Sequence, residues 1–324
     1  MMRAVQISGV GPSSVMQLVT TAIPELKKTE ILVRNAYAGV NYIDTYHRSG
    51  VYPLRSKILG MEGAGEVVAV GEGIDSGSVV KLGDLVAWPS TTNSYAEYVA
   101  VPLDRAVKVP PGIGLETACA SMLQGLTAHY LVTSSYAVKA DDWALVHAAS
   151  GGVGLLLCQM IRARGGHVIG TCSTEEKAVL ARAAGAEHVI VGYSDFAVRA
   201  KELAGGRGVN VVYDGVGKDT FAGSLDSLRP RGMMVLFGGA SGQVPPFDLQ
   251  GLAAKGSLSV TRPKLFDFIE TSEELQWRAR EVFDDVLAGK LNFAVGKVYP
   301  IENVAESHDD LEGRKTTGKL LLKL

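Results

Sequence analysis

The residues best suited to chemistry lie in a glycine-rich stretch, residues 147–154, with the sequence HAASGGVG. This stretch follows an apolar run typical of a strand and precedes one typical of a helix. Aligned with the pattern GxGxxG, Ala149 takes the first glycine position, and Gly151 and Gly154 take the second and third. Gly151 would let the backbone approach a pyrophosphate, and Gly154 would let the helix pack closely on the strand. We therefore expect a dinucleotide site, with an unliganded turn as the alternative. The expected phosphate-binding residues are Ser150, Gly151, Gly152, Val153 and Gly154.

The type of dinucleotide is indicated some twenty residues later, where NAD-binding units present an acidic residue to the ribose. The corresponding strand ends with GTCST, residues 170–174, and has no acidic residue at its tip. Ser173, Lys177 and Tyr193 could instead hold a 2′-phosphate, which favours NADPH. A compatible alternative is that Ser173 caps the next helix together with Glu176, in the pattern S-x-x-E.

Two regions of different pattern must position these residues. From about residue 143 onward, short apolar runs alternate with helical patterns and glycines, which predicts an α/β doubly wound parallel sheet. The N-terminal part has short strands separated by Gly, Pro and Asp, which predicts an antiparallel, barrel-like β domain. We place the final strand, helix and strand with the β domain. The predicted Rossmann-type dinucleotide-binding domain, residues 124–265, is therefore inserted in a β-rich domain of residues 1–123 and 266–324.

Composition excludes several classes of protein. Apolar residues make up 47% and charged residues 20% of the chain, as in ordinary globular proteins. A formal net charge of -2 argues against nucleic acid as a main partner, because neutralising phosphates requires a basic surface. The three cysteines are far apart, and the longest apolar stretch is far shorter than the ~20 residues of a membrane helix. We expect a cytoplasmic protein with no membrane partner.

Several motifs resemble the medium-chain dehydrogenase/reductase superfamily over essentially the whole chain. These are GMEGAGEVVAVGEG and GDLVAW in the N-terminal part, followed by AASGGVG. More narrowly, the chain is similar to the zinc-independent NADPH:quinone oxidoreductases related to zeta-crystallin. The stretches that carry this likeness are, in order, NYIDTYHRSGVYP, QGLTAHYL, HAASGGVG, VYDGVGKDTF and KGSLSVTRP. The resemblance implies a GroES-like N-terminal domain, NADPH as cofactor and a homodimer.

The resemblance also implies a reaction without metal. In the superfamily's alcohol dehydrogenases a Cys, a His and a second Cys bind catalytic zinc, and the matching positions here are Asn41, Met61 and Gln124. An amide and a thioether are poor zinc ligands. We expect Met61 to fill the former ligand pocket as apolar packing. Glu62 is either a ligand-like group in the active cleft or, as we favour, a carboxylate tied to turn N–H groups and a nearby arginine.

The family resemblance implies that a small-molecule quinone binds in the cleft between the domains, beside the nicotinamide. A quinone needs little from the protein beyond position and a few donors, because the cofactor supplies the hard chemistry. The residues expected to line the acceptor cleft or to donate to the reduced oxygen are Asn41, Tyr46, Tyr52 and Arg262. Those expected near the nicotinamide or its ribose, or elsewhere on the cofactor, are Asn41, Gln124, Thr127, Phe237, Gly238 and Arg314. In the alternative interpretation, Asn41 or Asp44 caps a short helix and the tyrosines are ordinary half-buried aromatics.

Two other functions remain open. The same cleft could serve an NADPH-dependent reductase of enals or enones, in which the hydride goes to carbon. The chain could also be a non-catalytic NADPH-binding protein that binds RNA. The acidic balance and the lack of interleaved basic and aromatic residues argue against that role.

Overall fold

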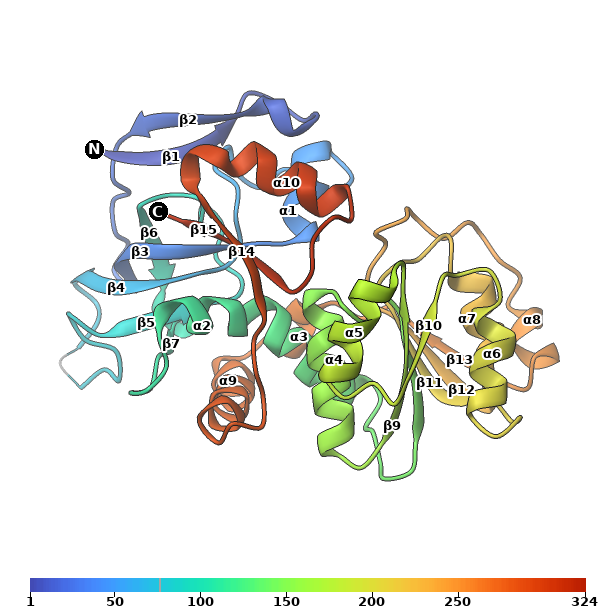
Figure 1. Cartoon of the computed structure of the whole chain (residues 1–324). Helices are drawn as coiled ribbons and strands as arrows, with labels where there is room; N and C mark the ends of the chain where they lie inside the picture. Colours follow the sequence, from blue (N-terminus) through green and yellow to red (C-terminus); the bar gives the residue numbers. More distant parts are fainter. Residues whose placement is uncertain (76) are drawn as a thin grey trace. The chain divides into compact units, whose positions relative to one another are not determined.

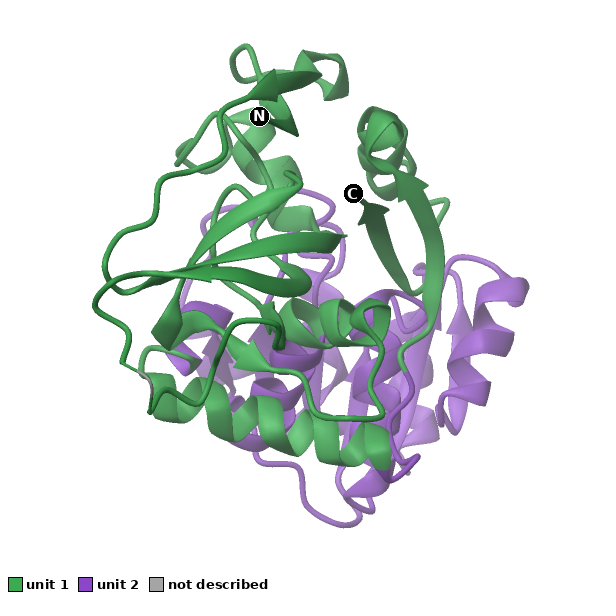
Figure 2. Ribbon diagram, turned by 90° about the vertical axis from the view of Figure 1, so that its left-hand side faces the viewer, with its two compact units in different colours: residues 1–124, 269–287, 293–324 green, residues 125–268, 288–292 purple. Residues whose placement is uncertain are grey.

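The computed structural model describes residues 1–75 and 77–324, which form two compact units. Figure 2 colours unit 1, residues 1–124, 269–287 and 293–324, and unit 2, residues 125–268 and 288–292. The predicted boundary differs because two short segments pack with unit 2. Phe268 stacks on Tyr130 with ring centroids 4.3 Å apart, and the Asn292 N–H donates to Gln159 Oε1 at 2.8 Å.

Unit 1 is built on a mixed β-sheet and a separate hairpin (Figure 1). The sheet order is β14 (Val295–Pro300), β15 (Lys319–Lys323), β3 (Glu30–Val40), β4 (Gly63–Val70), β5 (Leu85–Trp88) and β7 (Val107–Lys108), and β6 (Tyr98–Pro102) also pairs with β3. The hairpin consists of β1 (Met2–Ile7) and β2 (Met16–Thr21). Pairing is antiparallel as predicted, except that β14 and β15 are parallel. Trp88 is completely buried and packs in one core with Val33 and Val99.

Unit 1 has four α-helices among the residues described, and the segment after α2 departs from regular α-helical geometry. They are α1 (Tyr42–Ser49), α2 (Leu115–Ala120), α9 (Ser272–Leu287) and α10 (Val304–Glu312). Helix α9 has 16 residues. After α2 the chain passes through a π-helical turn, Ser121–Gly125, before α3 (Leu126–Tyr130) of unit 2. A second π-helical turn follows at Leu131–Ser135.

Unit 2 contains the predicted parallel sheet. Its order is β10 (His188–Val191), β9 (His167–Cys172), β8 (Trp143–Val146), β11 (Val209–Asp214), β12 (Leu228–Leu236) and β13 (Ser259–Thr261), and all neighbours are parallel. The helices after β8, β9, β10, β11 and β12 are α4 (Gly152–Ala163), α5 (Glu175–Ala183), α6 (Phe196–Leu203), α7 (Phe221–Ser227) and α8 (Gln250–Ala254). Figure 1 shows α4 and α5 on one face of the sheet and α6 and α7 on the other. The strand order reverses beside β8, which is where open α/β sheets bind ligands. Within the described part of the chain, no helix is long and apolar enough to cross a membrane.

Candidate functional site

The glycine-rich turn connects β8 to α4, as the sequence predicts. Gly151 precedes the helix in extended conformation, and its N–H donates to the Ala148 carbonyl at 2.8 Å. A Cβ atom at Gly154 would overlap that carbonyl oxygen and lie 2.8 Å from Ala149 Cα. Close packing of helix on strand therefore requires Gly154. A Cβ atom at Gly151 would meet only the Ala148 oxygen, at 3.2 Å. Packing therefore requires a glycine less strictly at position 151 than at position 154. A ligand that approaches the backbone at Gly151 would explain why a glycine is found there.

A buried polar network supports this turn, and the sequence did not indicate it. His147 Nδ1 lies 2.9 Å from Thr171 Oγ1, and its Nε2 lies 2.9 Å from Ser224 Oγ. The Ser224 hydroxyl donates to Asp214 at 2.8 Å, so Nε2 must donate to Ser224 while Nδ1 accepts from Thr171. Burial lowers the pKa of His147, consistent with a neutral ring. The network ties the ends of β8, β9 and β11 together. The sequence signal that could have revealed this network is the polar residue at the end of each of three apolar strands: His147, Thr171 and Asp214.

The residues expected to hold a 2′-phosphate follow two neighbouring strands. Ser173 comes directly after β9, and Tyr193 comes two residues after β10, whose Val191 pairs with Cys172. Ser173 is exposed, whereas Lys177 and Tyr193 are half-buried. The expectation that Ser173 caps α5 is wrong. Thr174 occupies the cap in extended conformation, and its hydroxyl accepts the Lys177 N–H at 3.4 Å.

The remaining expected residues of unit 2 lie in α3 and after the last two strands. Thr127 is buried in α3. The Phe237 N–H donates to the Asp214 carbonyl at 2.9 Å, and a Cβ atom at Gly238 would lie 2.6 Å from the Gly215 oxygen. These contacts bring Phe237 and Gly238 to the end of β11. Arg262 is exposed after β13 and donates to its neighbour's carbonyl.

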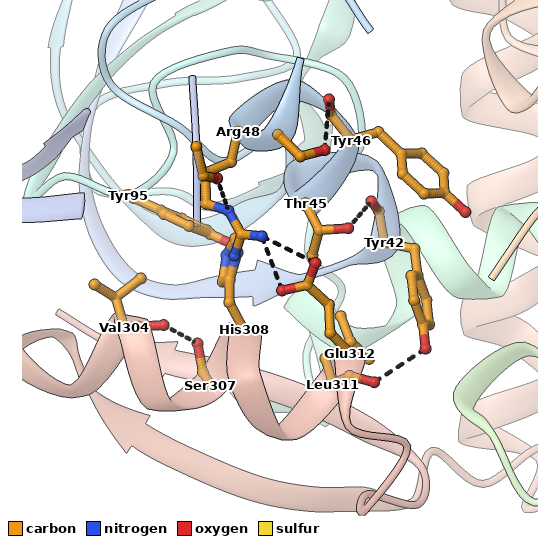
Figure 3. Close-up of polar contacts among 12 residues, drawn as sticks. Tyr42, Thr45, Tyr46, Arg48, Tyr95, Val304, Ser307, His308, Leu311 and Glu312 are labelled. Atoms are coloured by element: carbon orange, nitrogen blue, oxygen red, sulfur yellow. Dashed lines mark hydrogen bonds and ion pairs between the residues drawn. The ribbon is translucent and has the colours of Figure 1, made fainter. Parts of the chain in front are cut away.

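Three of the residues expected to bind the acceptor lie in or beside α1 in unit 1: Asn41, Tyr46 and Tyr52. Asn41 precedes the helix, and its N–H donates to the Asp44 carboxylate at 2.9 Å, so the helix-capping alternative is confirmed. Tyr46 and Tyr52 pack edge to face with ring centroids 5.2 Å apart. Figure 3 shows Tyr46 pointing away from Arg48 of the same helix. The tyrosines are half-buried, so their outer parts can contact a ligand.

The other side of α1 carries a buried chain of hydrogen bonds (Figure 3). Arg48 donates to both carboxylate oxygens of Glu312 at 2.9 Å and to His308 Nδ1 at 3.2 Å. The Tyr95 hydroxyl lies 3.1 Å from His308 Nε2 and 3.1 Å from Asp44 Oδ2. Because arginine only donates, His308 accepts at Nδ1 and donates from Nε2, and Tyr95 then donates to Asp44.

Burial shifts the pKa values of two groups in this chain of hydrogen bonds, Asp44 and His308. Burial raises the pKa of Asp44 to about 7, against hydrogen bonds from Asn41 and Tyr95 that favour the carboxylate. Burial, and then the charge of Arg48, lower the pKa of His308 to about 3. The imidazole is therefore neutral at physiological pH, as the donor pattern requires.

Glu62 is completely buried, and its partners differ from those expected. Its carboxylate pairs with Lys319 of β15 and accepts the Leu123 N–H in the π-helical turn. The Asn41 side-chain amide also donates to Glu62, at 2.9 Å. The partners are therefore a lysine and a helical N–H in place of the expected arginine and turn N–H groups. Met61 is 2% exposed and packs in the interior, as expected.

The last two expected cofactor residues of unit 1 lie in different surroundings. Gln124 is in the π-helical turn, and its buried Oε1 has no hydrogen-bond partner within residues 1–75 and 77–324. Arg314 is exposed after α10 and has a φ of 55°.

Both units match families of known proteins. Residues 27–111 match the family model described as an alcohol dehydrogenase GroES-like domain, and residues 152–277 match the one described as a zinc-binding dehydrogenase. The residues at the zinc-ligand positions do not fit this metal, because the Asn41 amide is engaged by Lys319 and Glu62 and Met61 offers a thioether. The described residues contain no group of three His, Cys, Asp or Glu side chains that could hold a metal ion.

Individual relatives extend the match over the whole chain. A probable quinone oxidoreductase of Schizosaccharomyces pombe is 44% identical over 320 residues, covering 98% of this chain and 96% of the relative. A 2-haloacrylate reductase of Burkholderia sp. is 39% identical and covers 90% of each chain. The crystal structure of Escherichia coli quinone oxidoreductase complexed with NADPH has a TM-score of 0.95 at 41% identity, covering 99% of this chain and 100% of that one. The predicted GroES-like and Rossmann-type fold is thereby confirmed. This chain belongs to the quinone oxidoreductase family of the medium-chain dehydrogenase/reductase superfamily.

Proposed function

We propose that this protein transfers a hydride from NADPH to a quinone without the help of a metal ion. The observation that carries the proposal is the glycine-rich turn at the point where the strand order of unit 2 reverses. A relative of 41% identity is complexed with NADPH, and it is named a quinone oxidoreductase. When bound, NADPH supplies the hydride, and solvent supplies the proton that completes the hydroquinone.

The chain's own residues would bind and orient the two reactants. The N–H groups of residues 150–154, at the start of α4, would hold the pyrophosphate. Ser173, Lys177 and Tyr193 would hold the 2′-phosphate. The remaining cofactor contacts are proposed for Asn41, Gln124, Thr127, Phe237, Gly238 and Arg314.

The acceptor would lie against α1. Tyr46 and Tyr52 would stack on the quinone ring, and Asn41 can donate its second amide N–H to a quinone oxygen. Arg262 would donate to the reduced oxygen. Tyr52→Ala should lower kcat/KM for the quinone at least tenfold while the Kd for NADPH stays within twofold. An unchanged kcat/KM would remove Tyr52 from the acceptor site.

Reduction of an activated carbon–carbon double bond is the second candidate, and the 2-haloacrylate reductase among the relatives supports it. NADPH oxidation should be followed with chelator-treated protein and four acceptors: an ortho-quinone, a para-quinone, a simple enal and 2-chloroacrylate. NADPH-dependent turnover of quinones alone supports the proposed function. Turnover of the enal or the chloroacrylate alone supports the second candidate, and tight NADPH binding without turnover points to a binding role.

Assembly and location are proposed from the same family. We propose a homodimer, supported by the position of β13 at a sheet edge and by the exposed side chains of Phe247 and Leu249. Light scattering on the purified protein would measure its mass. We also propose a cytoplasmic location, where thiols stay reduced, since the three cysteines are free. Cell fractionation would test it.

A further inference from the structure

The side chain of Asn41 is held in one orientation by a buried ion pair. Lys319 Nζ donates to Asn41 Oδ1 at 2.8 Å, and Asn41 Nδ2 donates to Glu62 Oε2 at 2.9 Å. Lys319 and Glu62 also pair with each other, and their side chains are 1% and 0% exposed. An ammonium group can only donate and a carboxylate can only accept, so the amide cannot turn over.

The same carboxylate acts on the helix that carries Gln124. Glu62 accepts the N–H of Leu123, which a regular α-helix would direct to the carbonyl of Cys119. The segment Ser121–Gly125 is instead a π-helical turn, a geometry that is rare and concentrated at functional sites. A side chain inserted into the helical hydrogen bonds is a recognised cause of such a departure. Gln124 follows Leu123, and its buried Oε1 lacks a partner among the residues described here.

Stability alone gives a poor reason for this arrangement. Two charges buried together lose much of their attraction to desolvation, and well-packed apolar residues are often as stable. The pair also demands a glycine on β3, because a Cβ atom at Gly39 would overlap Glu62 Oε2 and lie 2.8 Å from Lys319 Nζ. What the pair does achieve is to orient the Asn41 side chain and to hold the backbone of the turn that carries Gln124.

We propose that Glu62 and Lys319 are positioning residues for the reductase reaction. They hold the Asn41 amide with one N–H available to the acceptor, and they maintain the π-helical turn that presents Gln124. This inference rests on the proposed function. Both side chains are buried within unit 1, so their removal should reduce kcat while NADPH, whose phosphates are proposed to bind to unit 2, binds almost as tightly as before.

The test uses the full-length protein with the double substitution Glu62→Met and Lys319→Met, which removes both charges together. The matched control is Glu66→Gln on β4, the strand that begins directly after Glu62, and it breaks an exposed ion pair with Arg34. The double variant should keep its melting temperature and bind NADPH within threefold of the parent, but its kcat should fall on the order of 10²-fold. The control should match the parent in all three. An unchanged kcat in the folded double variant would overturn the proposal.

A second measurement does not depend on turnover. In protein labelled with ¹⁵N-leucine, the Leu123 amide proton should resonate downfield because it is bonded to a carboxylate, and it should move upfield in the double variant but not in Glu66→Gln. If the chemical shift of the Leu123 amide proton does not change in the double variant, the positioning role is wrong, whichever acceptor the protein reduces. If it responds but the parent reduces no acceptor, the proposed function has failed instead. Should the double variant not fold, Glu62→Asp, which retains the charge but is one methylene shorter, must show the same loss of kcat and the same shift.

Discussion

Lys319 of β15 donates to the side chain of Asn41 at 2.8 Å and so holds the beginning of α1 to the last strand of unit 1. The other end of α1 is held from the same part of the chain, because Arg48 is bonded to His308 and Glu312 of α10. Polar contacts at both ends thus hold in place the helix that carries Tyr46. Tyr46 on this helix, and Tyr52 packed against Tyr46, can be positioned precisely enough for stacking only if the helix does not shift.

Asp44 should make stability fall as pH rises. Its folded pKa of about 7 lies above the ordinary value of 3.8, so between these values the folded protein binds more protons than the unfolded chain. Relative to Asp44→Asn, the free energy of unfolding of the parent should decrease from about pH 4 to pH 7, by up to about 1.4 kcal/mol per pH unit. Urea denaturation across this range measures it, with Asp309→Asn on α10 as the exposed control. A pH-independent difference would contradict the buried, protonated carboxyl.

His308 should give the opposite slope. Its folded pKa of about 3 lies below the ordinary value of 6.5, so in this interval the unfolded chain binds more protons. Relative to His308→Gln, which can still accept from Arg48 and donate to Tyr95, the parent should gain stability from about pH 3 to pH 6.5. The same denaturation series checks this. A parent that instead loses stability over that interval would show that the imidazole is charged in the fold.

Alanine substitutions of Gly154 and Gly151 in the phosphate turn should affect different properties, the first stability and the second the affinity for NADPH. Gly154→Ala forces a Cβ atom into the backbone of Ala148 and Ala149, in the turn after β8, and should lower the free energy of unfolding by more than 1 kcal/mol. Gly151→Ala meets only one oxygen at 3.2 Å, so stability should change little while the Kd for NADPH rises at least tenfold. Thermal melts and fluorescence titration separate the two effects. Equal affinity in Gly151→Ala would argue against pyrophosphate binding at this turn.

Lys177 should decide the choice of dinucleotide. Replacing it with alanine removes a positive charge from the expected 2′-phosphate site, so the ratio of kcat/KM for NADPH over NADH should fall at least tenfold. Lys201→Ala, which changes a half-buried lysine of α6, is the matched control and should keep the ratio. A ratio that Lys177→Ala leaves unaltered would mean that the 2′-phosphate is bound elsewhere.

Local patterns were sufficient to predict much of the fold. Unit 2 has the predicted parallel sheet, and the glycine turn leads into α4 as expected, because alternation, periodicity and glycine spacing all act over a few residues. The cap of α5 was predicted one residue too early, at Ser173 in place of Thr174, since both residues carry a hydroxyl and precede acidic residues.

The partner of Glu62 could not be predicted in this way. Lys319 is 257 positions away, and it reaches Glu62 because β15 pairs antiparallel with β3 so that Leu320 lies opposite Val40. That register arises only in the folded sheet. The π-helical turn has the same origin, because the contact at Leu123 comes from Glu62, 61 positions away, and leaves no trace in the local sequence.

The most direct test of the central claim is the initial rate of NADPH oxidation by chelator-treated protein with a para-quinone as acceptor. We predict rapid turnover that is much slower with NADH and is not increased by added zinc. No turnover until zinc is restored, or equal rates with both dinucleotides, would contradict a metal-free, NADPH-dependent quinone reductase.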